Sequence, residues 1–222
     1  MKNKLNRLVF FLIVCLFLSH KTIAQPFIQD IQAFKKGDSL SFPPHHAILF
    51  VGSSSFTNWK DVQSYFPAHI IVNRGFGGSS LPDVIRYAGD IIFPYHPKQI
   101  IVYCGENDIA GDSMVTGKIV FKRFKTLYYK IRKNLLNVPL VYVSMKPSPS
   151  RWRMKERMIE GNNLIERFLK QKKRNAKFVS VWNIMLDPDG KPMDDIFISD
   201  KLHMNAKGYT IWQQVLGKLL LK

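Results

Sequence analysis

The sequence predicts an α/β protein: a three-layer α/β/α sandwich built around about five parallel strands. Five short runs of the chain are almost continuously apolar, which is typical of strands covered on both faces. Helical stretches separate these runs, and strands that alternate with helices form parallel sheets with right-handed crossovers. The composition agrees, because 222 residues with 46% hydrophobic and 22% charged residues exclude a disordered or collagen-like chain.

Residues 1–24 have the pattern of a cleavable signal peptide. A basic start precedes the 11-residue apolar run Leu8–Leu18, and the short Thr22-Ile23-Ala24 segment follows before Gln25. A membrane-spanning helix needs about 20 apolar residues, so this run is too short for an anchor. We therefore expect a secreted or periplasmic protein. Cleavage removes four basic residues and no acidic ones, which lowers the formal net charge from +17 to +13.

Residues 25–46 precede the first predicted strand. Their apolar side chains from Phe27 to Phe34 predict a short amphipathic helix that packs on the body of the protein, and Phe42-Pro43-Pro44 breaks the chain after it. Residues 47–222 are predicted to form one domain, since no internal repeat and no second domain is visible.

The elements of this domain follow from the spacing of its apolar residues. The predicted strands are Ala47–Val51, His69–Asn73, Gln99–Cys104, Pro139–Ser144 and Lys177–Val181. The helices with the clearest helical period are Lys118–Leu135, Met154–Lys172 and Ala206–Leu221.

Polar segments follow several of these strands, and ligands of open parallel sheets lie beyond the carboxyl ends of the strands. The first three strands are followed by Gly52-Ser53-Ser54-Ser55, Asn73–Ser79 and Gly105-Glu106-Asn107-Asp108. A further polar segment, Asp200-Lys201-Leu202-His203, precedes the last predicted helix. We expect all of these segments at one edge of the sheet.

These residue types suit acyl transfer. A serine hydroxyl attacks a carbonyl only when a base removes its proton, and His203 is the candidate base. Asp200 lies three residues earlier, where it can fix the tautomer of the imidazole and stabilise its charged form. The backbone N–H groups of the serine and of Gly78, with the amide of Asn107, are candidate donors to the developing oxyanion.

Each segment alone has a simpler interpretation. Gly-Ser-Ser-Ser after a strand is commonly a turn and a helix cap, and Asn107-Asp108 or Asp200 before a helix is commonly a capping group. Their joint occurrence in this order is what points to catalysis.

In combination, the segments resemble the SGNH hydrolases, also called the GDSL family of esterases and lipases, over most of the chain from about Ala47. The resemblance implies a flavodoxin-like SGNH hydrolase fold. It implies Ser54 as nucleophile, Asp200 and His203 as its partners, and Ser54, Gly78 and Asn107 as the oxyanion hole. Lys146 to Trp152 and the segment after His203 resemble a secreted bacterial branch similar to platelet-activating-factor acetylhydrolase subunits.

The first motif departs from the family name, because Ser53 stands where the family has aspartate. Gly-Ser-Ser-Ser is a usual variant in the branch that the chain resembles, so this departure does not indicate a dead enzyme. The residues alone leave open which of three serines attacks. Phe56 also excludes the Gly-x-Ser-x-Gly turn of the α/β-hydrolases.

We therefore expect a secreted serine esterase that hydrolyses short-chain esters, acetyl esters above all, of a carbohydrate or lipid through an acyl-enzyme. One alternative is an O-acyltransferase that acts on a glycan with the same triad. Another is a basic protein that binds an anionic polymer through its positive charge. No cofactor, metal site or nucleic-acid partner is expected, and attraction of an anionic substrate or surface is possible on charge alone. Lys146 and Arg151 follow the fourth strand, where they can contact substrate or pair with acidic residues.

Overall fold

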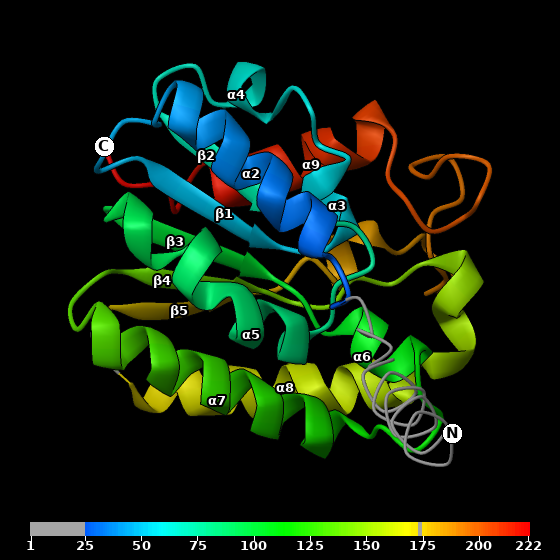
Figure 1. Cartoon of the computed structure of the whole chain (residues 1–222). Coiled ribbons are helices and arrows are strands. Elements are labelled where there is room, and N and C mark those ends of the chain that lie inside the picture. Colours follow the sequence, from blue (N-terminus) through cyan, green and yellow to red (C-terminus); the bar gives the residue numbers. More distant parts are fainter. Residues whose placement is uncertain (1–24, 173–174) are drawn as a thin grey trace, which may run out of the picture.

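Five parallel strands form the centre of the computed structural model, which describes residues 25–172 and 175–222 (Figure 1). The predicted signal peptide, residues 1–24, lies outside the described residues. The strand order is β2-β1-β3-β4-β5, so the predicted parallel sheet is confirmed. The strands are β1 (Ile48–Gly52), β2 (Ile71–Gly75), β3 (Gln99–Tyr103), β4 (Leu140–Val143) and β5 (Ala176–Val179).

The central strands β1, β3 and β4 are buried on both faces, which explains why these strands are apolar at successive positions. In β1, Leu49 and Val51 belong to one hydrophobic core, whereas Ile48 and Phe50 belong to a second core on the other face. Successive side chains of a strand point to opposite faces, so a strand between two layers must be apolar at every position.

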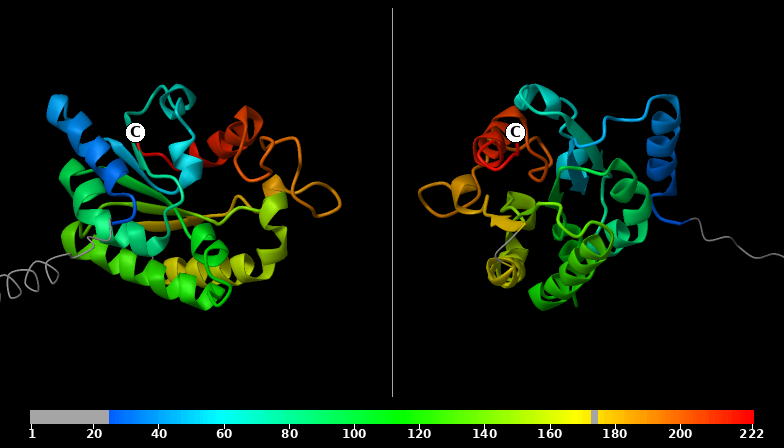
Figure 2. Two further views of the ribbon diagram at one scale, coloured as in Figure 1. Left: turned by 45° about the vertical axis from the view of Figure 1, so that its right-hand side comes forward. Right: turned by 90° about the vertical axis from the view of Figure 1, so that its left-hand side faces the viewer.

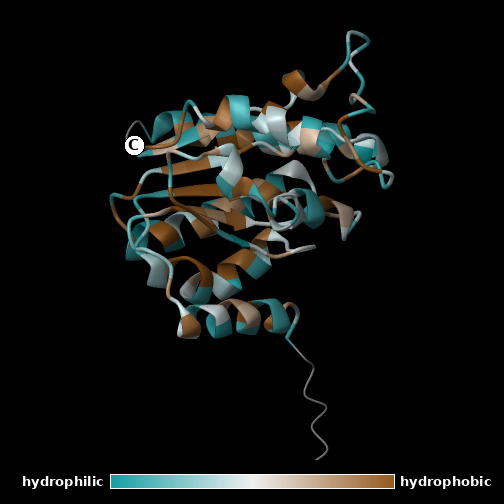
Figure 3. Cartoon of the chain, turned by 90° about the horizontal axis from the view of Figure 1, so that it is seen from above, coloured by the Kyte–Doolittle hydropathy of each residue, from teal (hydrophilic) through white to brown (hydrophobic). Residues whose placement is uncertain are grey.

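The first core lies beneath α2 (Ile28–Leu40), α5 (Leu81–Ile91), α7 (Gly117–Asn134) and α8 (Lys155–Gln171). The second lies beneath α3 (Ser54–Thr57), α4 (Val62–Tyr65) and α9 (Ala206–Leu216). The remaining short helices are α6 (Glu106–Ala110), η1 (Phe93–Tyr95), η2 (Pro149–Met154) and η3 (Asn183–Met185). Figure 2 shows the helices on both sides of the sheet, and Figure 3 shows that the strands between them are largely hydrophobic.

The predicted elements agree with the structure, with differences at their ends. Helix α5 is not among the helices that the apolar period predicts. Its start is marked in the sequence by Ser80 and Asp83, which form a capping box in which the Ser80 N–H donates to the Asp83 carboxylate at 2.9 Å. The last helix ends at Leu216 instead of Leu221, with Gly217 following it. Within the described ranges, no helix has the length and apolarity that crossing a membrane requires.

The carboxyl ends of the central strands lie side by side. Gly52 of β1 is in register with Gly75 of β2 on one side and with Tyr103 of β3 on the other. The segments that follow these three residues therefore begin at one edge of the sheet, as predicted.

Candidate active site

Ser54 is positioned by the close approach of two strand ends. Gly52 ends β1 with φ of 140°, and a Cβ atom on it would lie 1.8 Å from the carbonyl oxygen of Tyr103. Only glycine fits there, because both the contact and the φ angle exclude a side chain. The Ser53 N–H then donates to the same Tyr103 oxygen at 3.0 Å, and Ser54 begins α3 as a half-buried residue.

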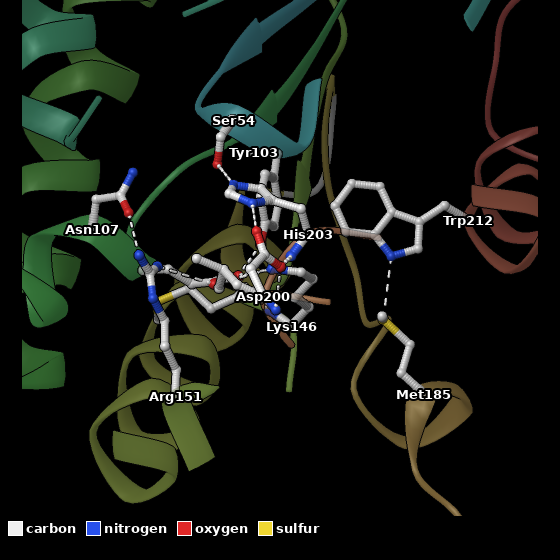
Figure 4. A network of polar contacts seen from close by, with 12 residues as sticks. Ser54, Tyr103, Asn107, Lys146, Arg151, Met185, Asp200, His203 and Trp212 are labelled. Atoms are coloured by element: carbon white, nitrogen blue, oxygen red, sulfur yellow. Dashed lines mark hydrogen bonds and ion pairs between the residues drawn. The ribbon is translucent and has the colours of Figure 1, made fainter. Parts of the chain in front are cut away.

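His203 bridges Ser54 and Asp200. Its Nε2 lies 2.8 Å from the Ser54 Oγ, and its Nδ1 lies 2.5 Å from Asp200 Oδ2 (Figure 4). The structure thus brings together residues that are 149 positions apart in the chain. Because a carboxylate only accepts hydrogen bonds, Nδ1 carries the proton toward Asp200, which leaves Nε2 free to accept the Ser54 proton.

The Asp200 carboxylate is held in its ionised form. Its other oxygen accepts the backbone N–H groups of Leu202 and His203, both at 2.9 Å. Desolvation alone would raise the pKa of Asp200, but the backbone and side-chain hydrogen bonds from His203, with the one from Leu202, lower it to about 2. The group is therefore an acceptor at any pH near neutrality.

The predicted oxyanion donors lie on the segments after β2 and β3. Gly78 has φ of 81°, a region that favours glycine, and its N–H has no hydrogen-bond partner within residues 25–172 and 175–222. Asn107 donates from Nδ2 to the Ser79 carbonyl at 3.0 Å, which uses one of its two amide hydrogens. Gly77 lies beside Ser54, since a Cβ atom on it would be 4.0 Å from the Ser54 Cβ.

Lys146 is buried and pairs with an acidic residue, which is one of the two arrangements that the sequence left open. Its side chain is 2% exposed, and its Nζ lies 3.2 Å from Glu106 Oε2 and 3.4 Å from the Tyr103 hydroxyl. Burial lowers the pKa of Lys146, while the adjacent Glu106 carboxylate opposes that shift.

Arg151 pairs with the same acidic residue, Glu106. Its Nη1 lies 3.3 Å from Glu106 Oε2, and its Nη2 donates to Asn107 Oδ1 at 2.7 Å. Figure 4 shows its side chain reaching the amide oxygen of Asn107. The backbone N–H of Ser150, next to it, donates to the Lys201 carbonyl at 3.1 Å.

Glu106 is the residue that sequence reasoning missed. It is 3% exposed and lies among Lys146, Arg151 and Tyr103, whose hydroxyl donates a hydrogen bond to its carboxylate. It precedes Asn107 directly, and two cations follow the next strand. An acidic residue after one strand and two cations after the next could have suggested an ion pair. However, nothing in the sequence distinguishes a buried glutamate from a solvated one at the start of a short helix.

The thiol of Cys104 does not compete with Ser54 as a nucleophile. Cys104 is a buried free thiol, and burial, with the nearby Asp108 carboxylate second, raises its pKa well above the ordinary value. In the part of the chain that the structure describes, no group of three or more His, Cys, Asp or Glu residues is arranged to hold a metal ion.

A parallel α/β/α sandwich with a Ser-His-Asp chain at its carboxyl edge is the architecture of one class of serine hydrolases. Sequence comparison identifies the family within that class. The GDSL-like lipase/acylhydrolase family matches residues 37–211. The chain belongs to this family and is a carboxylic ester hydrolase, so the resemblance noted in the sequence is confirmed.

Solved structures with the same fold include three bacterial proteins. A GDSL-like lipase from Bacteroides thetaiotaomicron has 17% sequence identity and a TM-score of 0.71, and the match covers 85% of this chain and 96% of that one. A lipase/acylhydrolase from Enterococcus faecalis has 15% identity, a TM-score of 0.64 and coverages of 78% and 94%. An acetylxylan esterase from Geobacillus stearothermophilus, a catalytic mutant, has 11% identity, a TM-score of 0.62 and coverages of 79% and 94%. A comparison with curated proteins finds no match.

Proposed function

We propose that this protein is an exported serine esterase that removes short acyl groups, acetyl above all, from esters of a carbohydrate or lipid. The observation that carries the catalytic part is the unbroken hydrogen-bond chain from Ser54 through His203 to Asp200. The acetylxylan esterase among the similar structures supports the choice of acyl group and of carbohydrate. Export is supported by the signal-peptide pattern of residues 1–24.

In the proposed reaction, the Ser54 Oγ bonds to the ester carbonyl carbon while its proton passes to His203 Nε2. The carbonyl oxygen becomes an oxyanion, which accepts hydrogen bonds from the Ser54 and Gly78 N–H groups and from the second amide hydrogen of Asn107. The tetrahedral species then collapses. The bond to the alcohol oxygen breaks, and that oxygen takes the proton from His203.

The resulting acyl-enzyme is hydrolysed by the same groups in reverse order. His203 removes a proton from water, the water oxygen bonds to the acyl carbon, and Ser54 leaves with the proton returned by His203. Asp200 stays ionised through both halves, because its pKa of about 2 lies far below neutrality, and it stabilises the imidazolium formed in each.

The direct test compares turnover of p-nitrophenyl acetate and p-nitrophenyl palmitate by the wild type, Ser54→Ala and Ser55→Ala. We expect faster turnover of the acetate, loss of activity by about 10⁴-fold or more in Ser54→Ala, and retention in the neighbouring Ser55→Ala control. Labelling with a fluorophosphonate, followed by peptide mapping, should modify Ser54. Equal turnover by Ser54→Ala would remove this residue from the mechanism. Free acetate released without an added glycan acceptor separates hydrolysis from acyl transfer.

The positive charge of the chain supports a second element of the proposal, electrostatic attraction of anionic esters. The formal charge of residues 25–222 is +13, and charge of this size steers anionic ligands in a way that salt screens. We expect kcat/KM for a negatively charged acetyl ester to fall severalfold between about 0.05 and 0.5 M NaCl. The neutral p-nitrophenyl acetate is the matched control and should show no comparable decline. An equal response of both esters would contradict the attraction.

A further inference from the structure

Arg151 contacts two residues of the segment that carries the proposed oxyanion donor. Its Nη2 donates to the Asn107 amide oxygen at 2.7 Å, and its Nη1 lies 3.3 Å from the Glu106 carboxylate. Its side chain is only 15% exposed, so these contacts are largely shielded from water. Arg151 itself takes part in no bond-making or proton-transfer step of the proposed reaction.

The partners of the Asn107 side chain determine which way its amide points. Arg151 can only donate hydrogen bonds, so the atom facing it must be the amide oxygen. The Ser79 carbonyl can only accept, so the atom facing it, at 3.0 Å, must be the amide nitrogen. These two requirements agree on one orientation and exclude the flipped amide, in which a carbonyl oxygen would replace the donor nitrogen.

The guanidinium also has reason to remain in place. Glu106 is 3% exposed and needs cationic partners, and Arg151 is one of the two cations that neutralise it, with Lys146 as the other. Arginine suits this position because its planar fork donates to two acceptors at once, whereas lysine presents a single charged centre. Glu106 therefore fixes Arg151, and Arg151 fixes the amide of Asn107.

We propose that Arg151 is a positioning residue for the oxyanion hole: it holds the Asn107 amide with Nδ2 as the free donor. The positive charge of Arg151, next to the amide oxygen of Asn107, also polarises that amide and makes the Asn107 N–H groups stronger donors. This proposal rests on the proposed oxyanion role of Asn107. Because an oxyanion forms only as the reaction proceeds, Arg151 contributes to kcat and hardly to substrate binding.

The test measures kcat and KM for p-nitrophenyl acetate in Arg151→Met, Arg151→Lys and Arg153→Met. Arg153 lies in the same η2 segment, is exposed and has no partner in the described part of the chain, so it controls for loss of one charge. We expect kcat to fall about 10- to 100-fold in Arg151→Met with KM changed less than about threefold, because loss of one complete oxyanion donor costs about 10² to 10³. Arg151→Lys should lose less, and Arg153→Met should match the wild type.

Combining the Arg151 variants with Asn107→Ala shows whether Arg151 acts through Asn107. If it does, Arg151→Met adds little, less than about twofold, to the loss caused by Asn107→Ala. Multiplicative losses in the double variant would overturn the proposal. So would a rise in KM with kcat unchanged, which is the signature of direct substrate contact. Thermal melts of each variant identify an unfolded protein, and if Arg151→Met fails to fold, the same cycle with Arg151→Lys decides the question.

The outcomes also separate this inference from the proposed function. Wild-type activity in Asn107→Ala would refute the oxyanion role of Asn107 itself. Loss of activity in Asn107→Ala, with full activity in both Arg151 variants, would refute the positioning role alone.

Discussion

His203 and Asp200 lie in a partly exposed loop, whereas Asn107 adjoins a cluster of buried charges. Side-chain exposure is 22% for His203 and 42% for Asp200, and short-range hydrogen bonds between positions 200 and 203 hold the pair together. Next to Asn107, the side chains of Glu106 and Lys146 are 4% and 2% exposed. We call His203 and Asp200 the base half of the site, and Asn107 with Glu106 and Lys146 the oxyanion half.

This difference corresponds to what each half is proposed to do. The imidazole must pass a proton to a leaving alcohol and take one from water, so access to solvent serves it. The oxyanion donors must keep a fixed orientation while charge develops, and a buried ion-paired network cannot reorient without exposing unpaired charges. The four predictions below test the two halves separately, from the largest expected effect to the smallest.

In the base half, His203→Gln removes the proposed acceptor of the Ser54 proton. We expect kcat/KM for p-nitrophenyl acetate to fall about 10⁵-fold, since loss of the base disables the whole chain. His69→Gln is the matched control, because His69 lies before β2 at the opposite edge of the sheet and its ring contacts the Leu221 carbonyl. A loss below about tenfold in His203→Gln would show that another group accepts the proton.

The second substitution, Asp200→Asn, replaces the acceptor that fixes the tautomer of His203. We expect kcat to fall about 10³- to 10⁴-fold, because the neutral amide neither enforces the tautomer nor stabilises the imidazolium. Asp195→Asn serves as control, since Asp195 is an exposed residue nearby that pairs with Lys207 at 3.1 Å. Steady-state kinetics on both variants measure the effect, and similar losses in both would contradict a specific role for Asp200.

In the oxyanion half, Lys146→Met should lower stability instead of removing a reacting group. It leaves the buried Glu106 carboxylate short of one cation, and breaking a buried pair costs about 3 kcal/mol in free energy of unfolding. Urea denaturation measures this loss, with Lys155→Met as control because Lys155 forms a surface pair with Glu156. The double variant Lys146→Met with Glu106→Gln should recover part of the stability, and failure to recover any would contradict the ion-pair explanation.

The smallest effect concerns pH. The pKa of Asp200 is lowered to about 2 from an ordinary value of about 3.9, so its carboxylate stabilises the folded state above about pH 4. That contribution is lost as the pH falls through about 2. Thermal melts should therefore show wild type and Asp200→Asn differing by a few degrees at pH 6 and converging near pH 2. A difference that is constant across this range would exclude the Asp200 charge as its cause.

Much of the fold could be predicted from the sequence, because burial on both faces leaves a direct trace in the apolar strands. Ser54, Gly78, Asn107, Asp200 and His203 were predicted because the segments after parallel strands must share one edge and because the motifs resemble a known family. The structure brings Ser54, His203 and Asp200 into contact, and their catalytic roles stay predictions.

The ion pairs next to the site could not be predicted in the same way. Glu106, Lys146 and Arg151 are charged residues in polar segments, a pattern that indicates solvent exposure in most proteins. Their burial results from contact between segments 40 and 45 residues apart, and a single sequence gives no measure of such a distance. For Arg151, the sequence left open contact with substrate or pairing with an acidic residue. These two arrangements differ only in the orientation of the side chain, which depends on packing.

The contact between Gly52 and the Tyr103 carbonyl has a consequence for altering the enzyme's substrate range. Main-chain atoms of two adjacent strands fix the start of the segment that carries Ser54, so the position of the proposed nucleophile depends on this backbone contact. Libraries that randomise exposed positions near Ser54 and keep Gly52 therefore leave this backbone contact intact while they explore new acyl or alcohol groups. Position 52 should be excluded from such libraries, because every alternative amino acid would push the strand ends apart.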